Sequence, residues 1–295
     1  MLRPMLIALL LAVPATGARS AAPDCSEYQS LLDRYLVRVD PRAKETDTRF
    51  DYERLYVDER MFQQHRSPLL ERIHAGLTDV HPAELAPAER LAWAINTYNF
   101  LVLERATQFL IAPGKKPVRQ RAVEDMRSPA GGFFAAPVCM IDGRRYSLAE
   151  FERRFVYDDT TSVLEARAVA TDPRRWLALC SGHLGDPPLA PRAYRADSLE
   201  AQLDAAARTA LALPRFVRLH EDSHQLDLSD VIARRFVDFG GTIDGAIPFV
   251  ERYAPPEVRK AIRKYPIRRV TLVMPADPAL NQFPRAHANA PATTS

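Results

Sequence analysis

The chain has 295 residues, of which 47% are hydrophobic and 26% charged, and its formal net charge is +3. A chain this close to neutrality is a poor candidate for nucleic-acid binding, which requires a concentrated basic surface, so no nucleic-acid partner is expected. The Arg-Arg pairs, Arg234-Arg235 among them, are interleaved with acids, and we expect them to lie on solvated faces.

Residues 1–20 have the pattern of a secretory signal peptide. Arg3 supplies the positive start, the apolar run "MLIALLLAVPATG" covers most of the following residues, and Ala18-Arg19-Ser20 resembles a small-residue cleavage site. The run is shorter than the roughly 20 residues that span a membrane. We therefore expect cleavage, a periplasmic or secreted protein, and no membrane anchor in the mature form.

The remaining residues show no Gly/Ser linker and no internal repeat, which predicts one domain over residues 49–283. Residues 21–48 are expected to form a frayed N-terminal extension. Residues 284–295 have no apolar period and are expected to form a disordered tail.

The predicted elements mix helices and hairpins without a βαβ rhythm. Helical spacing covers residues 86–110 and 199–213, and two short helices separated by Pro255-Pro256 follow later. Asp142-Gly143 predicts a hairpin turn, and "WLALC" and "RVTLVM" are consistent with buried strands. The expected fold class is α+β: a single domain with helices packed on short antiparallel hairpins and buried strands.

The run His220-Glu221-Asp222-Ser223-His224 matches the zinc-protease pattern H-E-x-x-H. That chemistry requires the motif on a helix, where both histidines face the metal. Here it joins two alternating apolar runs, as a hairpin turn does. We therefore predict no metal site and no cofactor.

"LAWAINTYNFLVL" places Trp93, Asn96, Tyr98 and Asn99 inside an apolar helix. A buried amide needs hydrogen-bond partners whatever the function of the protein. The first interpretation is structural, in which Asn96 and Asn99 hold the backbone of an adjacent segment. The second is a binding or active-site role, for which these four residues are the candidate substrate-binding residues.

Six motifs in order resemble the domain of unknown function 547 family of bacteria and plants, from about Phe50 to Asn281. They are "ERLAWAINTYNFLVL", "GRRYSLAEFERRF", "TDPRRWLALCSGHLGDPPL", "AYRADSLEAQLDAAARTAL", "LDLSDVIARRFVDFGG" and "VERYAPPEV". The resemblance implies a fold, but no established activity.

The chain departs from the family pattern at the positions that carry reactive side chains. Arg153 and Trp176 stand where the family tends to have histidines, although Glu152 is kept. Ser181 and Asp186 stand where the family commonly has two loop cysteines, and Cys180 lies one residue early. A one-residue shift on a strand reverses the face, so Cys180 does not simply replace the family's cysteine.

Three interpretations of Cys180 remain open: a disulfide with Cys139, an inert buried thiol, or a reactive thiol. Cys25 is the third cysteine of the chain. An odd number of cysteines leaves at least one of them unpaired within the chain.

Two functional hypotheses follow. A binding or interaction protein, with an unknown small molecule, peptide or protein as partner, is favoured by the loss of the family's histidines and loop cysteines. The alternative is a hydrolase or acyl-transfer enzyme. In it Cys180 or Ser181 attacks, His183 is the base and Asp186 orients it, with Glu152 at the same site.

Overall fold

The computed structural model describes residues 23–40, 42, 46–61, 67–110, 122–157, 172–264, 267, 269–274 and 277–283. The expected signal peptide and the expected C-terminal tail lie outside the described residues. Within the described ranges, every helix is too short or too polar to cross a membrane.

The N-terminal segment is folded, so the expectation of a frayed extension over residues 21–48 is wrong for its described part. Helix α1 (Ser26–Tyr35) is followed by strand β1 (Leu36–Arg38), which pairs antiparallel with β2 (Thr48–Phe50). Four side chains of α1 are buried at the spacing i, i+3, i+4, i+7 that marks one helix face. They are Tyr28, Leu31, Leu32 and Tyr35.

The long helix α5 (Pro87–Leu110) forms the centre of the molecule, as its apolar period predicts. Residues 92–103 are all buried, and a helix that is buried on every side needs neighbours on every side. Helix α4 (Pro68–Thr78) and the π-helical turn η3 (Glu152–Val156) pack against it. The short helices α2 (Tyr52–Asp58) and η1 (Pro82–Glu84) lie between α1 and α5 in the chain.

The predicted Asp142-Gly143 hairpin is confirmed. Strands β5 (Pro137–Ile141) and β6 (Arg144–Ser147) pair antiparallel, and Asp142 and Gly143 have φ of 47° and 75°, the left-handed conformation that this two-residue turn requires. A capping box at Ser147 then starts α6 (Leu148–Phe151), which continues into η3. The helical turn η2 (Val123–Asp125) and the two-residue strands β3 (Arg127–Ser128) and β4 (Gly131–Gly132) precede the hairpin.

The expected strand "WLALC" is instead the end of a short helix, α7 (Arg174–Ala178), and only then does the chain become extended, at Leu179. Apolar period alone does not separate a buried strand from a buried helical turn in so short a run. The Asp172 carboxylate accepts a hydrogen bond from the backbone N–H of Arg174 at 3.0 Å, which satisfies one donor at the start of this helix.

The C-terminal part carries the one three-stranded sheet of the described residues. Strands β7 (Val217–His220) and β8 (Gln225–Ser229) form the predicted antiparallel hairpin, and β9 (Arg269–Met274) adds to β8 in parallel. The H-E-x-x-H run is therefore a hairpin turn, as predicted. The helices of this part are α8 (Leu199–Leu211), α9 (Asp230–Arg234), α10 (Ile243–Tyr253) and α11 (Pro256–Lys264).

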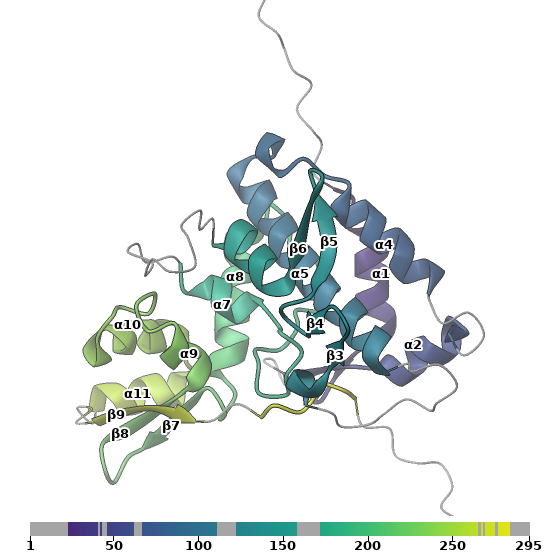
Figure 1. Cartoon of the computed structure of the whole chain (residues 1–295). Helices are drawn as coiled ribbons and strands as arrows, with labels where there is room; N and C mark the ends of the chain where they lie inside the picture. The colour runs from purple at the N-terminus through teal and green to yellow at the C-terminus, as the bar shows by residue number, and fades with distance from the viewer. Residues whose placement is uncertain are drawn as a thin grey trace, which may run out of the picture.

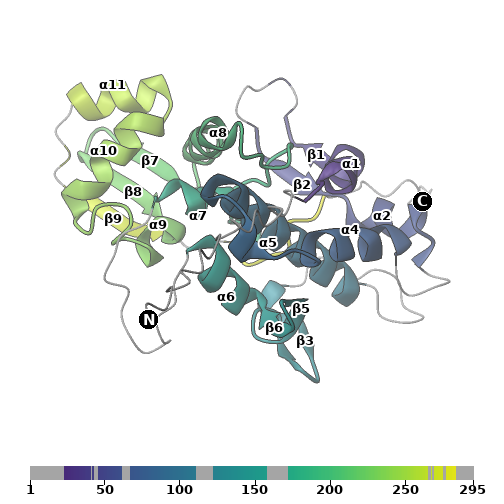
Figure 2. The same ribbon diagram turned by 90° about the horizontal axis from the view of Figure 1, so that it is seen from above.

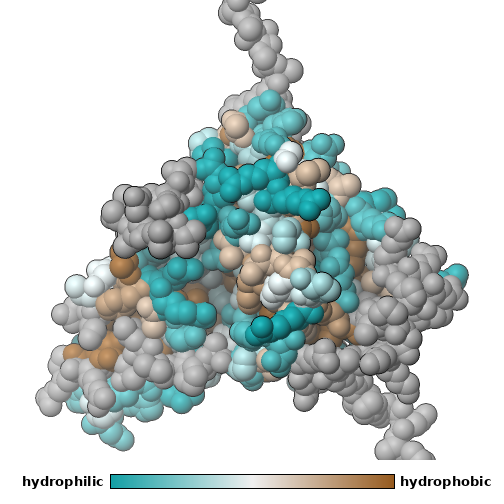
Figure 3. All heavy atoms as spheres, in the orientation of Figure 1, coloured by the Kyte–Doolittle hydropathy of each residue, from teal (hydrophilic) through white to brown (hydrophobic). Residues whose placement is uncertain are grey.

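The two ribbon views agree on the arrangement. Strands β7–β9 with α9–α11 lie at one end and α1, α2 and α4 at the other, with α5, α7 and α8 between them (Figures 1 and 2). In the space-filling view, hydrophilic residues cover most of the upper part of the face, and hydrophobic residues show at the lower left over α10 (Figure 3). The fold is the predicted α+β class, with short antiparallel hairpins.

Candidate functional site

A cavity of about 340 Å³ lies where α5, η3, α9 and the loop 179–187 meet. We call residues 179–187 the pocket loop. Five of the nine residues predicted for the site line it: Tyr98, Glu152, Ser181, His183 and Asp186. The other four predicted residues, Trp93, Asn96, Asn99 and Cys180, are absent from its lining. We call this cavity the His183 pocket.

The two asparagines of α5 hold extended backbone, as the structural interpretation predicts. Asn99 donates to the carbonyl of Ala178 at 3.0 Å and accepts from the N–H of Cys180 at 2.9 Å. Asn96 makes the same pair of bonds with the backbone of Tyr194, both at 2.8 Å. Both amides are buried, so Asn99 fixes the start of the pocket loop and Asn96 fixes a segment further along.

The two aromatic residues of the same helix have different surroundings. Trp93 donates its ring N–H to the carbonyl of Leu77 at 2.8 Å and packs against Phe151, inside the core. Tyr98 is buried at the floor of the pocket, where its hydroxyl hydrogen-bonds the Glu152 carboxylate. Of these two, Tyr98 alone is placed to meet a ligand of the His183 pocket.

Cys180 has the surroundings of an inert thiol. Its sulfur accepts a hydrogen bond from the side-chain amide of Asn281 at 3.6 Å, and burial raises its pKa to about 12. Cys139 is also buried and free, with its pKa raised to about 12 by burial, and Cys25 is free and half-buried. A thiol with so high a pKa has little thiolate at neutral pH, which favours the second of the three interpretations.

Ser181, His183 and Asp186 are in contact, but not in the order of a catalytic triad. The Ser181 hydroxyl donates to Oδ2 of Asp186 at 2.6 Å and lies 2.9 Å from Nδ1 of His183. The same Nδ1 lies 3.3 Å from Oδ2 of Asp186. In a triad the serine and the aspartate contact opposite ring nitrogens, whereas here they share one.

The other ring nitrogen of His183 faces a residue that the sequence analysis missed. Nε2 lies 2.7 Å from Oε1 of Glu124, which is on η2. Burial disfavours the imidazolium, but the carboxylates of Asp186 and Glu124 favour it more, so the pKa of His183 is raised. The imidazolium form, which these carboxylates favour, has no lone pair to accept the serine proton.

The pocket loop owes its path to a glycine. Gly182 has φ of +96°, a conformation that favours glycine, and a Cβ there would lie 3.2 Å from a methyl group of Val102. At the far end of the loop, Arg215 donates to the carbonyl of Asp186 at 2.9 Å while it pairs with Asp47. The loop is therefore fixed at both ends and in its middle.

Residues 277–283, which we call the strap, cross this loop and tie it to distant parts of the chain. Leu184 and Gly185 donate their backbone N–H groups to Ala279 and Asp277, at 2.6 and 3.0 Å. Within the strap, Asn281 donates to the carbonyl of Gly182 at 2.7 Å, and its own carbonyl accepts from Phe50 of β2 at 3.2 Å. A further backbone bond links Pro278 to Val123, beside Glu124.

Two arginines of the α9 region, Arg234 and Arg235, also line the pocket, and both are exposed, as expected for this pair. The guanidinium of Arg235 lies 3.9 Å from the ring centre of Trp176, a close cation–π contact. Its Nη2 lies 3.6 Å from Oε1 of Glu152, which is near enough to attract and too far for a hydrogen bond. Burial raises the pKa of Glu152, although the charge of Arg235 opposes that shift.

No group of three or more His, Cys, Asp or Glu side chains in the described ranges is arranged to hold a metal ion. In the H-E-x-x-H turn, His220 pairs instead with Asp227, with 2.7 Å between Nε2 and Oδ2.

Comparison with known proteins gives a family and no activity. Residues 82–210 match the model of the family described as "Protein of unknown function, DUF547". No curated protein and no solved structure matches the chain. The matched residues include α5, the β5–β6 hairpin and the pocket loop, so the resemblance is confirmed over the part of the chain that builds most of the pocket.

Proposed function

Because residues 82–210 match the DUF547 family, whose description assigns no activity, we propose a function from the pocket itself. The protein is a binding protein of the periplasm or the secreted fraction. Its His183 pocket takes a small dipolar molecule, and amino acids and short peptides are the class to test first.

One observation carries this proposal: the lining of the pocket contains charges of both signs, contributed by different elements. Arg234 and Arg235 come from the α9 region, while Glu124, Glu152 and Asp186 come from η2, η3 and the pocket loop. A ligand with an anionic end and a cationic or N–H-donating end matches this arrangement better than an ion of one sign.

The separation of Glu152 and Arg235 supports the same conclusion. At 3.6 Å the two groups attract each other without a hydrogen bond, so each keeps hydrogen-bonding capacity for a ligand. The Trp176 ring, between Arg235 at 3.9 Å and the stacked ring of Tyr157 at 3.7 Å, offers an apolar edge beside them. A cavity of about 340 Å³ is within the range of small-ligand sites.

The alternative, an acyl-transfer or hydrolytic enzyme, has less support from the geometry. Cys180 is buried outside the pocket with a pKa of about 12, and Ser181 shares one imidazole nitrogen with Asp186. A serine nucleophile would require His183 to be neutral and Ser181 to be released from Asp186.

Location outside the cytoplasm is part of the proposal and rests on the signal-like residues 1–20. The full-length chain is expressed with its own leader, and the mass of the protein in the periplasmic or culture fraction is measured. A mass that lacks about twenty N-terminal residues supports export. An intact chain in the cytoplasm argues against it.

The binding proposal is tested by calorimetric titration of the purified protein with free amino acids and dipeptides. Their N-acetylated and C-amidated forms are the matched ligands that lack one charge. Both modifications are expected to weaken binding at least tenfold. N-acetylation removes the positive charge that pairs with the carboxylates of the pocket, and C-amidation removes the negative charge that pairs with its arginines. Uniform failure of all these ligands to bind refutes the proposal.

Two variants separate binding from catalysis. Arg235→Gln is expected to abolish binding, and Arg145→Gln, on the exposed side of the β5–β6 hairpin, is the control that keeps it. Ser181→Ala keeps binding within a few-fold under the proposal. Covalent labelling of Ser181 by a fluorophosphonate, lost in His183→Ala, would instead favour the enzyme.

A further inference from the structure

A second cavity, of about 300 Å³, lies at the turn between α10 and α11, against α8. Three of its lining residues are arginines, Arg208, Arg252 and Arg259, and none of the described residues that line it is acidic. The rest of the lining is neutral and includes the Tyr253 ring. We call this cavity the arginine pocket; it shares no lining residue with the His183 pocket.

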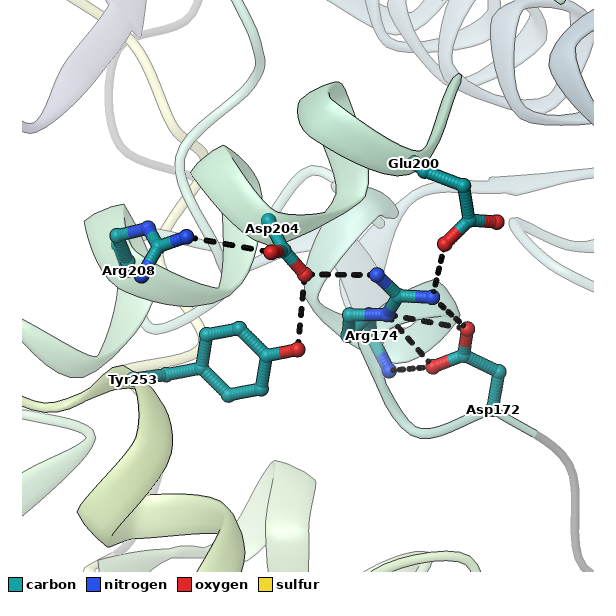
Figure 4. A network of polar contacts seen from close by, with 6 residues as sticks. All are labelled: Asp172, Arg174, Glu200, Asp204, Arg208 and Tyr253. Atoms are coloured by element: carbon teal, nitrogen blue, oxygen red, sulfur yellow. Dashed lines mark hydrogen bonds and ion pairs between the residues drawn. The ribbon is translucent and has the colours of Figure 1, made fainter. Parts of the chain in front are cut away.

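The carboxylate that contacts Arg208, that of Asp204, belongs to a network centred on another arginine. Figure 4 shows Arg174 bound by three carboxylates, with contacts of 2.6 Å to Asp172, 2.6 Å to Glu200 and 2.7 Å to Asp204. Asp204 also accepts the hydroxyl of Tyr253 at 2.8 Å. The Asp204 carboxylate therefore contacts three residues, Arg174, Tyr253 and Arg208.

Arg208 is held in position by this network but is not saturated by it. It makes one contact with Asp204, at 3.2 Å, and half of its side chain remains exposed. A guanidinium has five N–H donors, so most of those of Arg208 remain open to another acceptor.

Arg252 and Arg259, the other two arginines of this pocket, are engaged less than Arg208 by acidic groups. Among the described residues, neither Arg252 nor Arg259 makes an ion pair with a carboxylate, and the Nε of Arg259 is buried without a hydrogen-bond partner. Glu251 of α10 pairs with Arg263 at 3.8 Å. Two guanidinium groups of the arginine pocket thus make no ion pair with a described acidic group.

Two of the three guanidinium groups lie close to the same ring. The guanidinium carbons of Arg208 and Arg252 are 5.6 and 5.1 Å from the ring centre of Tyr253. This ring is buried, and its hydroxyl is fixed by Asp204, so it is a rigid base for flexible side chains. Fixing the arginines before binding lowers the entropic cost of binding.

We propose that the arginine pocket binds a phosphate group. Guanidinium forks bond two oxygens each, and the three terminal oxygens of a phosphate can be shared among several forks, whereas one fork already satisfies a carboxylate. The phosphate is that of a small soluble phosphate compound or that of a lipid headgroup. This inference does not depend on the function proposed for the His183 pocket.

Calorimetric titration of the whole protein with pyrophosphate and with inorganic phosphate, at low ionic strength, is the first arm of the test. Co-sedimentation with vesicles of phosphatidylcholine, with and without phosphatidic acid, is the second. The expected result is binding in at least one arm. The two arms distinguish a soluble phosphate from a headgroup.

The variant Arg252→Gln/Arg259→Gln is expected to lose at least tenfold in that binding. Arg263→Gln is the matched control, because Arg263 is also on α11, is exposed and lies outside the pocket. Thermal unfolding verifies that each variant is folded, and Arg235→Gln is expected to bind phosphate normally. Failure to bind in both arms, or an equal loss in Arg263→Gln, overturns the proposal.

Discussion

Replacing Asn99 with alanine is expected to destabilise the protein strongly and to disturb the His183 pocket. The side chain is 2% exposed, and its amide bonds the carbonyl of Ala178 and the N–H of Cys180. Alanine leaves both backbone groups buried without a partner. An unsatisfied buried group costs about 1–3 kcal/mol, so two of them predict a loss of about 2–6 kcal/mol.

The loss is large against the stability of a typical domain, about 5–15 kcal/mol, so unfolding in urea at low temperature is the suitable measurement. Asn96→Ala is the matched control. It is on the same helix and removes the same pair of bonds, but from Tyr194. Similar destabilisation is expected for both variants, with altered ligand binding in Asn99→Ala alone.

Two results would refute this reasoning. A loss of stability below about 1 kcal/mol in Asn99→Ala would mean that water or another group replaces the amide. An equal change of binding in Asn96→Ala would mean that general loosening of α5, and not the fixed start of the loop, affects the pocket.

Three further predictions concern the same loop. Gly182→Ala is expected to cost about 1–3 kcal/mol in urea unfolding, because φ is +96° and the added methyl group approaches Val102; an unchanged midpoint contradicts this. Iodoacetamide at pH 7 is expected to alkylate Cys25, which is half-buried, faster than Cys180, whose pKa is about 12, as peptide mapping will show; the reverse order contradicts it. Because the pKa of His183 is raised, its protonation stabilises the folded state fully below pH 6.5, and this contribution is lost as pH rises through the folded pKa. We therefore expect the free energy of unfolding of the parent protein to fall more steeply than that of His183→Gln as pH rises above 6.5. Parallel plots of the free energy of unfolding against pH for the two proteins would refute this prediction.

The elements that the sequence predicts well are those with a strong local cause. Helix α5 has a long apolar period, and the β5–β6 turn has a dipeptide that tolerates left-handed φ. Helix α7 was missed because five residues carry too little period to distinguish a strand from a helix. Helix α1 was missed although its four buried residues follow one helix face.

The residues of the His183 pocket likewise separate into those that the sequence brings together locally and those that only the tertiary fold brings together. Ser181, His183 and Asp186 are within six residues of one another, so their proximity was predictable from the sequence. Which imidazole nitrogen each contacts depends on the path through Gly182, and no sequence pattern specifies it. Glu124 and Arg235 reach the pocket only through tertiary contacts, the former beside the strap and the latter at the end of α9.

The strap gives the pocket a dependence on synthesis order. Residues near position 180 leave the ribosome about a hundred residues before those of the strap, and Phe50 is far earlier still. Until the strap arrives, Gly182, Leu184 and Gly185 lack the backbone partners that fix the loop. The backbone bonds that fix the pocket loop are therefore among the last that the growing chain can form, and a chain interrupted before residue 277 would lack them.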